Sequence, residues 1–194
     1  MKYYYKYIIS KDGKIFYYRK NGIKESWYRV SDKVGIKGLS KYKKNIGSPS
    51  AAGIVVLRKF GDKIKILALE GHEKYTSKMN LLNGRLYDIP KGRMEPGEST
   101  LQAAKRETEE ETSITKLKFK WGLNTVYRDK NSKKQLIVFM AITTQDPEIK
   151  QNPVSGVYEH KDYKWISFDT MKKKCYDYLI PIIEWAENIY NNKS

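Results

Sequence analysis

The sequence predicts an α/β sandwich in which several strands enclose one helix and a second helix packs outside the strands. Short β-rich apolar runs recur through most of the chain, and we expect strands at residues 52–57, 63–69, 86–89, 118–127, 135–143 and 163–166. A helical pattern interrupts these runs after Ser99, and a second one begins at Asp169. Strands that alternate with helical segments are typical of an α/β protein.

The helix after Ser99 has a recognisable start and one apolar stripe. Ser99 with Gln102 three residues later resembles a capping box, and Leu101, Ala104 and Thr108 recur at the spacing of a buried helix face. The C-terminal helix carries a second apolar stripe, and Pro181 lies in or near its first turn. The polar segment 71–84 between the second and third expected strands is predicted to be a loop.

A small β meander is predicted at the N-terminus. The dipeptides Asp12-Gly13 and Asn21-Gly22 are typical of two-residue hairpin turns, and they separate β-rich runs at 3–10, 15–19 and 26–31. About thirty residues cannot bury enough surface to be stable alone, so we expect the meander to dock on the rest of the chain. We therefore divide the chain into residues 1–44, a basic, tyrosine-rich meander with its linker, and a main domain at 45–194.

Composition excludes several classes of protein. The chain has 194 residues, enough for a genuine core, and no apolar run approaches the roughly 18 residues that a transmembrane helix requires. A single cysteine, Cys175, excludes an internal disulfide and favours a core role in a reducing compartment. We expect a cytoplasmic protein with no membrane partner.

Positive charge is concentrated at the N-terminus. Residues 1–50 contain 13 Lys or Arg against three acidic residues, and eight of the 16 tyrosines of a chain whose formal net charge is +16. Basic residues interleaved with aromatic ones can neutralise phosphates and stack on bases, which suggests RNA as a partner of residues 1–44. A solvated, lysine-rich sheet surface is the alternative.

One group of acidic residues, by contrast, is confined to a short stretch. Six glutamates fall within 17 residues, at positions 95, 98, 107, 109, 110 and 111. At about 100° per residue, Glu107, Glu110 and Glu111 lie on one helix face, where like charges repel. A hard divalent cation would reverse that repulsion, and Glu98, in the loop before the helix, can reach Arg106. The alternative is a solvated acidic face.

The order of these residues resembles a known motif. Gly92, five residues, Glu98, seven residues and then Arg106-Glu107-Thr108-Glu109-Glu110-Glu111 is similar to the box of the Nudix hydrolases, GX5EX7REUXEEXGU. Thr108 at the aliphatic position and Ser113 in place of the glycine after the helix depart from the pattern, but neither change removes a carboxylate. The resemblance covers roughly residues 48–190 and implies an α/β/α sandwich with a mixed sheet.

A narrower resemblance points to asymmetric diadenosine tetraphosphate hydrolases. The segments YDIPKGRMEPGES and EHKDYKWISFDTM are similar to those enzymes, which share a PKG run, an ExxxxxW segment and a tyrosine before the penultimate strand. Here these are Pro90-Lys91-Gly92, Glu159 with Trp165, and Tyr127. The same loop also resembles Nudix enzymes that act on RNA 5′ ends and caps, or on diphosphoinositol polyphosphates.

The resemblance implies roles for individual residues. Glu107, Glu110 and Glu111, with the Gly92 carbonyl and Glu159, would hold Mg²⁺, for which Mn²⁺ is an alternative. Glu107, or else Glu159, would accept the proton of the attacking water. Arg106 would hold Glu107 or Glu98 in place. Tyr127 would stack on adenine. Lys91 and Arg93, beside Gly92, are placed to contact the polyphosphate chain, and exposed surface side chains are the alternative. His160 has no partner at metal-ligand spacing and is assigned no role.

Three hypotheses about function follow. The first is a Mg²⁺-dependent pyrophosphohydrolase acting on nucleotide or dinucleoside polyphosphates, most like diadenosine tetraphosphate. The second is the same chemistry on RNA, as mRNA decapping or 5′-pyrophosphohydrolysis, with residues 1–44 holding the RNA. The third, a Nudix-fold RNA-binding protein without turnover, is disfavoured because every carboxylate of the box is present.

Overall fold

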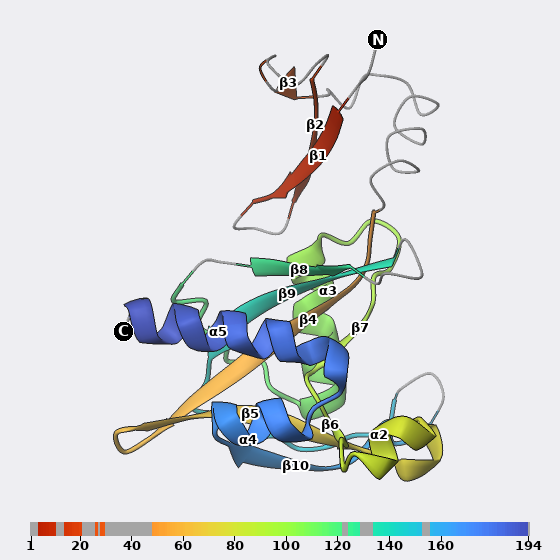
Figure 1. Ribbon diagram of the computed structural model, residues 1–194, viewed down its shortest axis with the longest axis vertical. Helices are drawn as coiled ribbons and strands as arrows, with labels where there is room; N and C mark the ends of the chain where they lie inside the picture. Colours follow the sequence, from red (N-terminus) through yellow and green to blue (C-terminus); the bar gives the residue numbers. More distant parts are fainter. Residues whose placement is uncertain are drawn as a thin grey trace.

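The computed structural model describes residues 4–10, 14–20, 26, 28–29, 48–121, 124–128, 134–152 and 156–193. Within these ranges the chain forms two separate sheets, one of three strands and one of seven (Figure 1). The larger sheet is covered by helices, so the predicted α/β class is confirmed.

The small sheet is the predicted meander. Strands β1 (Tyr4–Ile9), β2 (Ile15–Lys20) and β3 (Tyr28–Arg29) pair antiparallel in the order β1-β2-β3. Both expected hairpin dipeptides, at 12–13 and 21–22, lie outside the described residues. No strand pairing in the described part of the chain joins this sheet to the larger one, and its docking stays a prediction.

The large sheet is mixed, with the strand order β10-β5-β4-β9-β8 and the short strands β6 and β7 paired to β5 and β4. Only β4 and β9 run parallel; the other pairs are antiparallel. The strands are β4 (Ser48–Phe60), β5 (Lys63–Gly71), β6 (Tyr87–Asp88), β7 (Lys91–Arg93), β8 (Asn124–Arg128), β9 (Lys134–Ile142) and β10 (His160–Ile166).

Helices cover the large sheet on both faces (Figure 1). Alternate residues of β4 point to opposite sides: Ile54 and Val56 pack in the core under α3 (Thr100–Thr112), whereas Val55 and Leu57 pack in the core under the C-terminal helices. Those helices are α4 (Phe168–Lys174) and α5 (Ile180–Lys193), linked by the 3-10 turn η2 (Asp177–Leu179). This arrangement is the expected α/β/α sandwich.

Three expected elements differ in the structure. The single helix expected from Asp169 is divided into α4 and α5, because the chain leaves the helix at Cys175 and passes through η2. The segment predicted as a loop contains the 3-10 turn η1 (Glu73–Tyr75) and the short helix α2 (Lys78–Leu82), which begins because the Ser77 hydroxyl accepts a hydrogen bond from the Asn80 N–H. The strand expected from residue 118 begins only at Asn124. Lys118 forms a single bridge to Ile142 and a turn follows at residues 120–121, so the β-rich composition there does not produce a continuous ladder.

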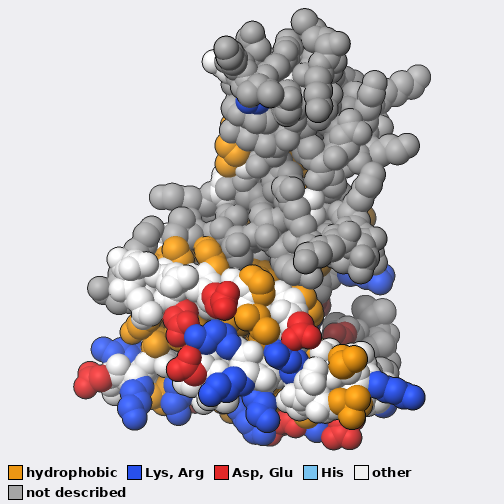
Figure 2. Space-filling model, in the orientation of Figure 1, with side chains coloured by type: hydrophobic (Ala, Val, Ile, Leu, Met, Phe, Trp, Pro, Cys, Tyr) orange, Lys and Arg blue, Asp and Glu red, His pale blue; other side chains and the backbone are white. Residues whose placement is uncertain are grey.

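On the face shown in Figure 2, both basic and acidic side chains are exposed. Over α4 and α5, basic and acidic side chains alternate, and hydrophobic side chains are exposed over α2, where Met79 and Leu82 are 64 % and 82 % exposed (Figure 2). Cys175 is buried in the core beneath α5, and burial raises the pKa of its thiol to about 12, as a packing role requires. No helix in the described ranges is long and apolar enough to cross a bilayer.

Candidate active site

The motif helix starts as the sequence predicts. The Ser99 hydroxyl accepts a hydrogen bond from the Gln102 N–H, and the Gln102 side chain accepts one from the Ser99 N–H, which completes the capping box. The helix ends at Ser113, whose φ of 60° is left-handed. The Ser113 hydroxyl donates to the Glu148 carbonyl, so the residue that replaces glycine still anchors the helix end.

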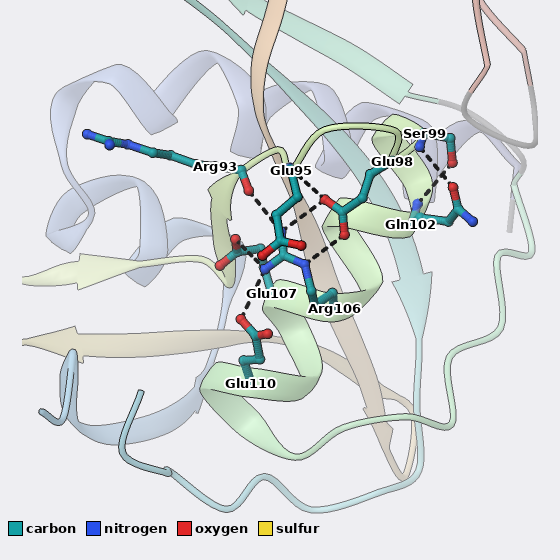
Figure 3. Close-up of polar contacts among 8 residues, drawn as sticks. All are labelled: Arg93, Glu95, Glu98, Ser99, Gln102, Arg106, Glu107 and Glu110. Atoms are coloured by element: carbon teal, nitrogen blue, oxygen red, sulfur yellow. Dashed lines mark hydrogen bonds and ion pairs between the residues drawn. The ribbon is translucent and has the colours of Figure 1, made fainter. Parts of the chain in front are cut away.

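Arg106 lies at the centre of the glutamate cluster (Figure 3). Its Nε and Nη2 donate to the two carboxylate oxygens of Glu98 at 2.7 and 3.0 Å, and its Nη1 donates to Glu107 at 2.9 Å and Glu110 at 3.0 Å. Nη2 also donates to the Arg93 carbonyl at 2.9 Å. One guanidinium therefore ties the loop before the helix to two glutamates on the helix, which is the holding role expected for Arg106 and Glu98.

Gly92 lies against the motif helix at the position of the Glu107 carboxylate. A Cβ atom here would overlap that carboxylate, so an alanine at this position would displace the end of the Glu107 side chain. The main chain of Gly92 therefore lies directly against a carboxylate of the cluster. Gly53 of β4 is in close contact with the same segment, because a Cβ on it would meet the Pro90 carbonyl at 2.6 Å.

The glutamates line one acidic pocket. Glu107, Glu110 and Glu111 meet Glu159 there, together with Lys150, Asn152 and His160. Glu111 is 7 % exposed and its carboxylate lies 3.1 Å from His160 Nε2. Glu159 is exposed, and the Asn152 side-chain amide donates to it at 2.6 Å. The structure thus brings the four predicted carboxylates to a common pocket from α3 and from the segment before β10.

Burial raises the pKa of two of these carboxyl groups. It raises the pKa of Glu107 to about 7, against the opposing effect of Arg106, and it raises the pKa of Glu111 despite the nearby His160 and Lys91. The hydrogen bonds from Arg106 lower the pKa of Glu98. Glu98 is therefore a fixed anion, whereas Glu107 can exchange a proton near neutral pH.

The donor set fits a hard divalent cation. Carboxylate and main-chain carbonyl oxygens are the ligands that Mg²⁺ prefers, and Gly92 brings a main-chain segment against Glu107. Among the described residues, no three His, Cys, Asp or Glu side chains converge tightly enough to hold a metal as they stand. The reason is visible in their contacts: Glu107 and Glu110 are turned to the Arg106 guanidinium, and Glu111 to His160.

A larger cleft of about 630 Å³ opens beside the acidic pocket. Glu111, Glu159 and His160 line both, so these three residues form a wall that the two spaces share. The other lining residues come from the segment 71–80, from the start of the motif loop and from the connection between α4 and α5; they include His72, Thr76, Asp88, Lys91, Tyr176 and Tyr178. The Tyr176 and Tyr178 rings are stacked with centroids 6.3 Å apart.

The three expected substrate contacts, Lys91, Arg93 and Tyr127, lie in different environments. Lys91 lines the cleft, is half-buried and is ion-paired with Asp88, and its contact with phosphate stays a prediction. Arg93 is exposed and its side chain points away from the carboxylates (Figure 3). Tyr127 lies in β8, paired with Leu136, and its side chain is outside the described part of the structure. Its role as a stacking residue stays a prediction.

Sequence reasoning missed several residues of the site. His160 was left without a role, yet it is 7 % exposed and bound to Glu111; its position directly after Glu159 was the available signal. No local pattern indicated Asp88, Tyr176 or Tyr178, because they reach the cleft only through tertiary packing. Thr108, the departure from the aliphatic position, is fully buried and its hydroxyl donates to the Ala104 carbonyl at 2.7 Å, which explains why a polar residue is tolerated.

The chain is similar in sequence to known proteins. The family model of the NUDIX domain matches residues 47–186. The bis(5′-nucleosyl)-tetraphosphatase [asymmetrical] of Caenorhabditis elegans is 30 % identical over 122 residues, which cover 61 % of this chain and 79 % of the relative. The Rattus norvegicus protein of the same name is 37 % identical over 87 residues, covering 41 % and 54 %.

Solved structures show the same similarity. The C. elegans Ap4A hydrolase in a binary complex superposes with a TM-score of 0.57 at 25 % identity, over 73 % of this chain and 98 % of that one. A MutT protein from Methanosarcina mazei superposes with a TM-score of 0.53 at 21 % identity, over 76 % and 99 %, and supports the fold alone.

Proposed function

Because this chain belongs to the NUDIX family and is a pyrophosphohydrolase, we propose that it uses Mg²⁺ to cleave dinucleoside polyphosphates of the diadenosine tetraphosphate type. One observation carries the proposal: the acidic pocket and the larger cleft share Glu111, Glu159 and His160 as walls. A nucleoside fits the roomy, tyrosine-lined cleft, and phosphates near the shared wall would face the carboxylates of the small acidic pocket.

The metal would be held by the Glu107, Glu110 and Glu111 carboxylates, the Gly92 carbonyl and Glu159, with Mn²⁺ as an alternative ion. When bound, it would neutralise phosphate charge and lower the pKa of a water molecule. These glutamates line one pocket, and Glu107 lies against the Gly92 main chain, which supports this ligand set.

The protein's own residues would perform the proton transfer and the positioning. Glu107 is the proposed general base because burial keeps the pKa of its carboxyl near 7, where it can accept a proton at neutral pH; Glu159, at the pocket mouth, is the second candidate. Arg106 and Glu98 would orient Glu107. Lys91, on the cleft wall, would contact the phosphate chain, and the tyrosine pair would line the space for the nucleoside.

Hydrolysis of diadenosine tetraphosphate with Mg²⁺ tests the proposal. Glu110→Gln should lose at least about 100-fold in kcat while it stays folded, since a metal ligand and an anionic group are removed together. Glu109→Gln, an exposed neighbour on the same helix, is the matched control and should keep full activity. Full turnover by Glu110→Gln would refute the site, and no turnover by the unaltered protein would refute the substrate class.

Capped or 5′-triphosphorylated RNA is the second candidate substrate. The observation that favours it is the three-stranded sheet formed within the segment that carries 13 Lys or Arg against three acids, with the Arg29 guanidinium 3.9 Å from the centre of the Phe16 ring. A compact dinucleotide needs no such charge. We propose residues 1–44 as the unit that would hold the RNA.

Replacing Lys41, Lys43 and Lys44 with glutamine should therefore weaken RNA binding and its salt dependence, and should leave the turnover of diadenosine tetraphosphate unchanged. Equal RNA affinity in the altered and unaltered proteins would argue against a role for this segment. The non-catalytic RNA-binding hypothesis has the least support, because the chain is a pyrophosphohydrolase with all its box carboxylates present.

A further inference from the structure

A buried carboxylate lies in the cleft wall outside the glutamate cluster. Asp88, the last residue of β6, is 5 % exposed and lines the cleft together with Lys91 and Tyr178. Three donors surround it: Lys91 Nζ at 2.6 Å, the Tyr178 hydroxyl at 3.2 Å and the Ile89 N–H at 2.8 Å. Through these contacts Asp88 joins β6, β7 and η2 at one point of the cleft wall.

The charges of this group are fixed. Lys91 Nζ lies within ion-pair distance of the Asp88 carboxylate, and a neighbouring anion favours the charged form of a lysine. Burial and the neighbouring Asp88 raise the pKa of Tyr178, so its hydroxyl stays neutral and donates a hydrogen bond. Lys91 is thus always a cation, and its charge is balanced within 2.6 Å by an anion.

This arrangement is unexpected in a site that must bind a polyanion. A carboxylate beside the phosphate-binding lysine weakens the attraction for phosphate, and a neutral acceptor would satisfy the same donors at a lower desolvation cost. An ion pair also restricts a flexible side chain, since a free lysine samples many rotamers. The compensating gain is therefore a defined position for the Lys91 ammonium.

We propose that Asp88 is a positioning residue that fixes the Lys91 ammonium against the phosphate chain and limits how tightly the cleft holds anionic product. The proposal rests on the hydrolase function proposed above. It extends that function by naming Asp88 as a residue that affects both kcat and the affinity for anionic product.

Asp88→Asn separates the two effects. The variant keeps an acceptor for Tyr178 and Ile89 but frees the lysine charge. We expect AMP affinity, measured by calorimetry in EDTA, to rise about threefold to tenfold with a steeper dependence on salt, the range that partly exposed charge pairs give. For diadenosine tetraphosphate with Mg²⁺, KM should fall and kcat should fall about tenfold, because the ammonium is no longer held.

Two further variants make the outcome decisive. Asp88→Glu keeps the charge but displaces the carboxylate by one methylene, so kcat should fall with no gain in AMP affinity. Asp177→Asn is the control, since it removes an exposed acid that pairs with Arg85 and does not line the cleft. It should leave AMP affinity and turnover unchanged.

The results distinguish the inference from the proposed function. Unchanged or weaker AMP binding by a folded Asp88→Asn, or full kcat in Asp88→Glu, would overturn the role of Asp88. If the unaltered protein does not hydrolyse diadenosine tetraphosphate, the substrate proposal fails instead, and the calorimetric measurements still decide whether Asp88 restrains the Lys91 charge.

Discussion

The protonation of Glu107 predicts how the stability of the metal-free protein depends on pH. Burial raises the pKa of this carboxyl from 4.5 to about 7 in the folded state, so between these values the folded protein binds more protons than the unfolded chain. The contribution of this carboxyl to the free energy of unfolding should therefore be most favourable below pH 4.5 and should fall as the pH rises to about 7. Glu111 acts in the same direction, and Glu98, whose pKa is lowered, in the opposite one.

The size of the effect follows from the shift. A difference of about 2.5 pH units corresponds to about 3 kcal/mol at about 1.36 kcal/mol per unit, and the 13 % exposure of the side chain makes this an upper value. Urea unfolding in EDTA at several pH values between 4.5 and 8 would measure it. In Glu107→Gln the free energy of unfolding should fall less over this pH range, because the titrating carboxyl is gone. Glu109→Gln should show the same pH dependence as the unaltered protein.

The expected contribution of metal has the opposite sign. Mg²⁺ requires deprotonated carboxylates, so it should raise the thermal midpoint more at pH 8 than at pH 5. Identical pH profiles for the unaltered protein and Glu107→Gln would refute the assignment of this carboxyl as the titrating group. An Mg²⁺ effect that does not change with pH would refute its coupling to the cation.

Three substitutions probe other parts of the site. Gly92→Ala should reduce kcat by more than about tenfold, because the new Cβ displaces the Glu107 carboxylate, and circular dichroism should show an intact fold. Arg106→Lys should lower the free energy of unfolding in urea by about 1–3 kcal/mol, since an ammonium cannot make the paired contacts to Glu98. A change of less than about 0.5 kcal/mol would contradict the role of Arg106 in tying the loop to the motif helix. Ser113→Gly should change stability by less than about 1 kcal/mol, because relief of the left-handed backbone offsets the lost hydrogen bond to Glu148.

The local parts of this architecture were predictable from sequence. The capping box at Ser99, the common face of the glutamates and the reach of Glu98 to Arg106 depend on spacings of at most eight residues, which helix geometry fixes. The two cores were equally accessible, because alternation along β4 determines which residues face each helix layer.

The parts that could not be predicted depend on long-range packing. Glu111 meets His160 across 49 positions in the chain, and Tyr178 meets Asp88 across 90. The expected strand from residue 118 was too long because β-rich composition does not reveal where a ladder finds its partner; only Lys118 bridges Ile142 before the turn. The helix α2 was missed because its single stabilising signal, the Ser77 cap, lies in a polar segment without an apolar stripe.

The contacts of Arg106 explain how Glu107 and Glu110 could turn from the guanidinium to a metal ion while the loop and the motif helix keep their positions. A guanidinium has five N–H groups, and those on Nε and Nη2 are directed to Glu98 and to the Arg93 carbonyl. Only Nη1 serves Glu107 and Glu110, the two proposed metal ligands. If these carboxylates turned to a metal, Arg106 would keep most of its partners, and Glu98 would keep its further hydrogen bond from the Glu95 N–H. The loop and helix would therefore stay joined while the proposed ligands reorient, at the cost of two hydrogen bonds.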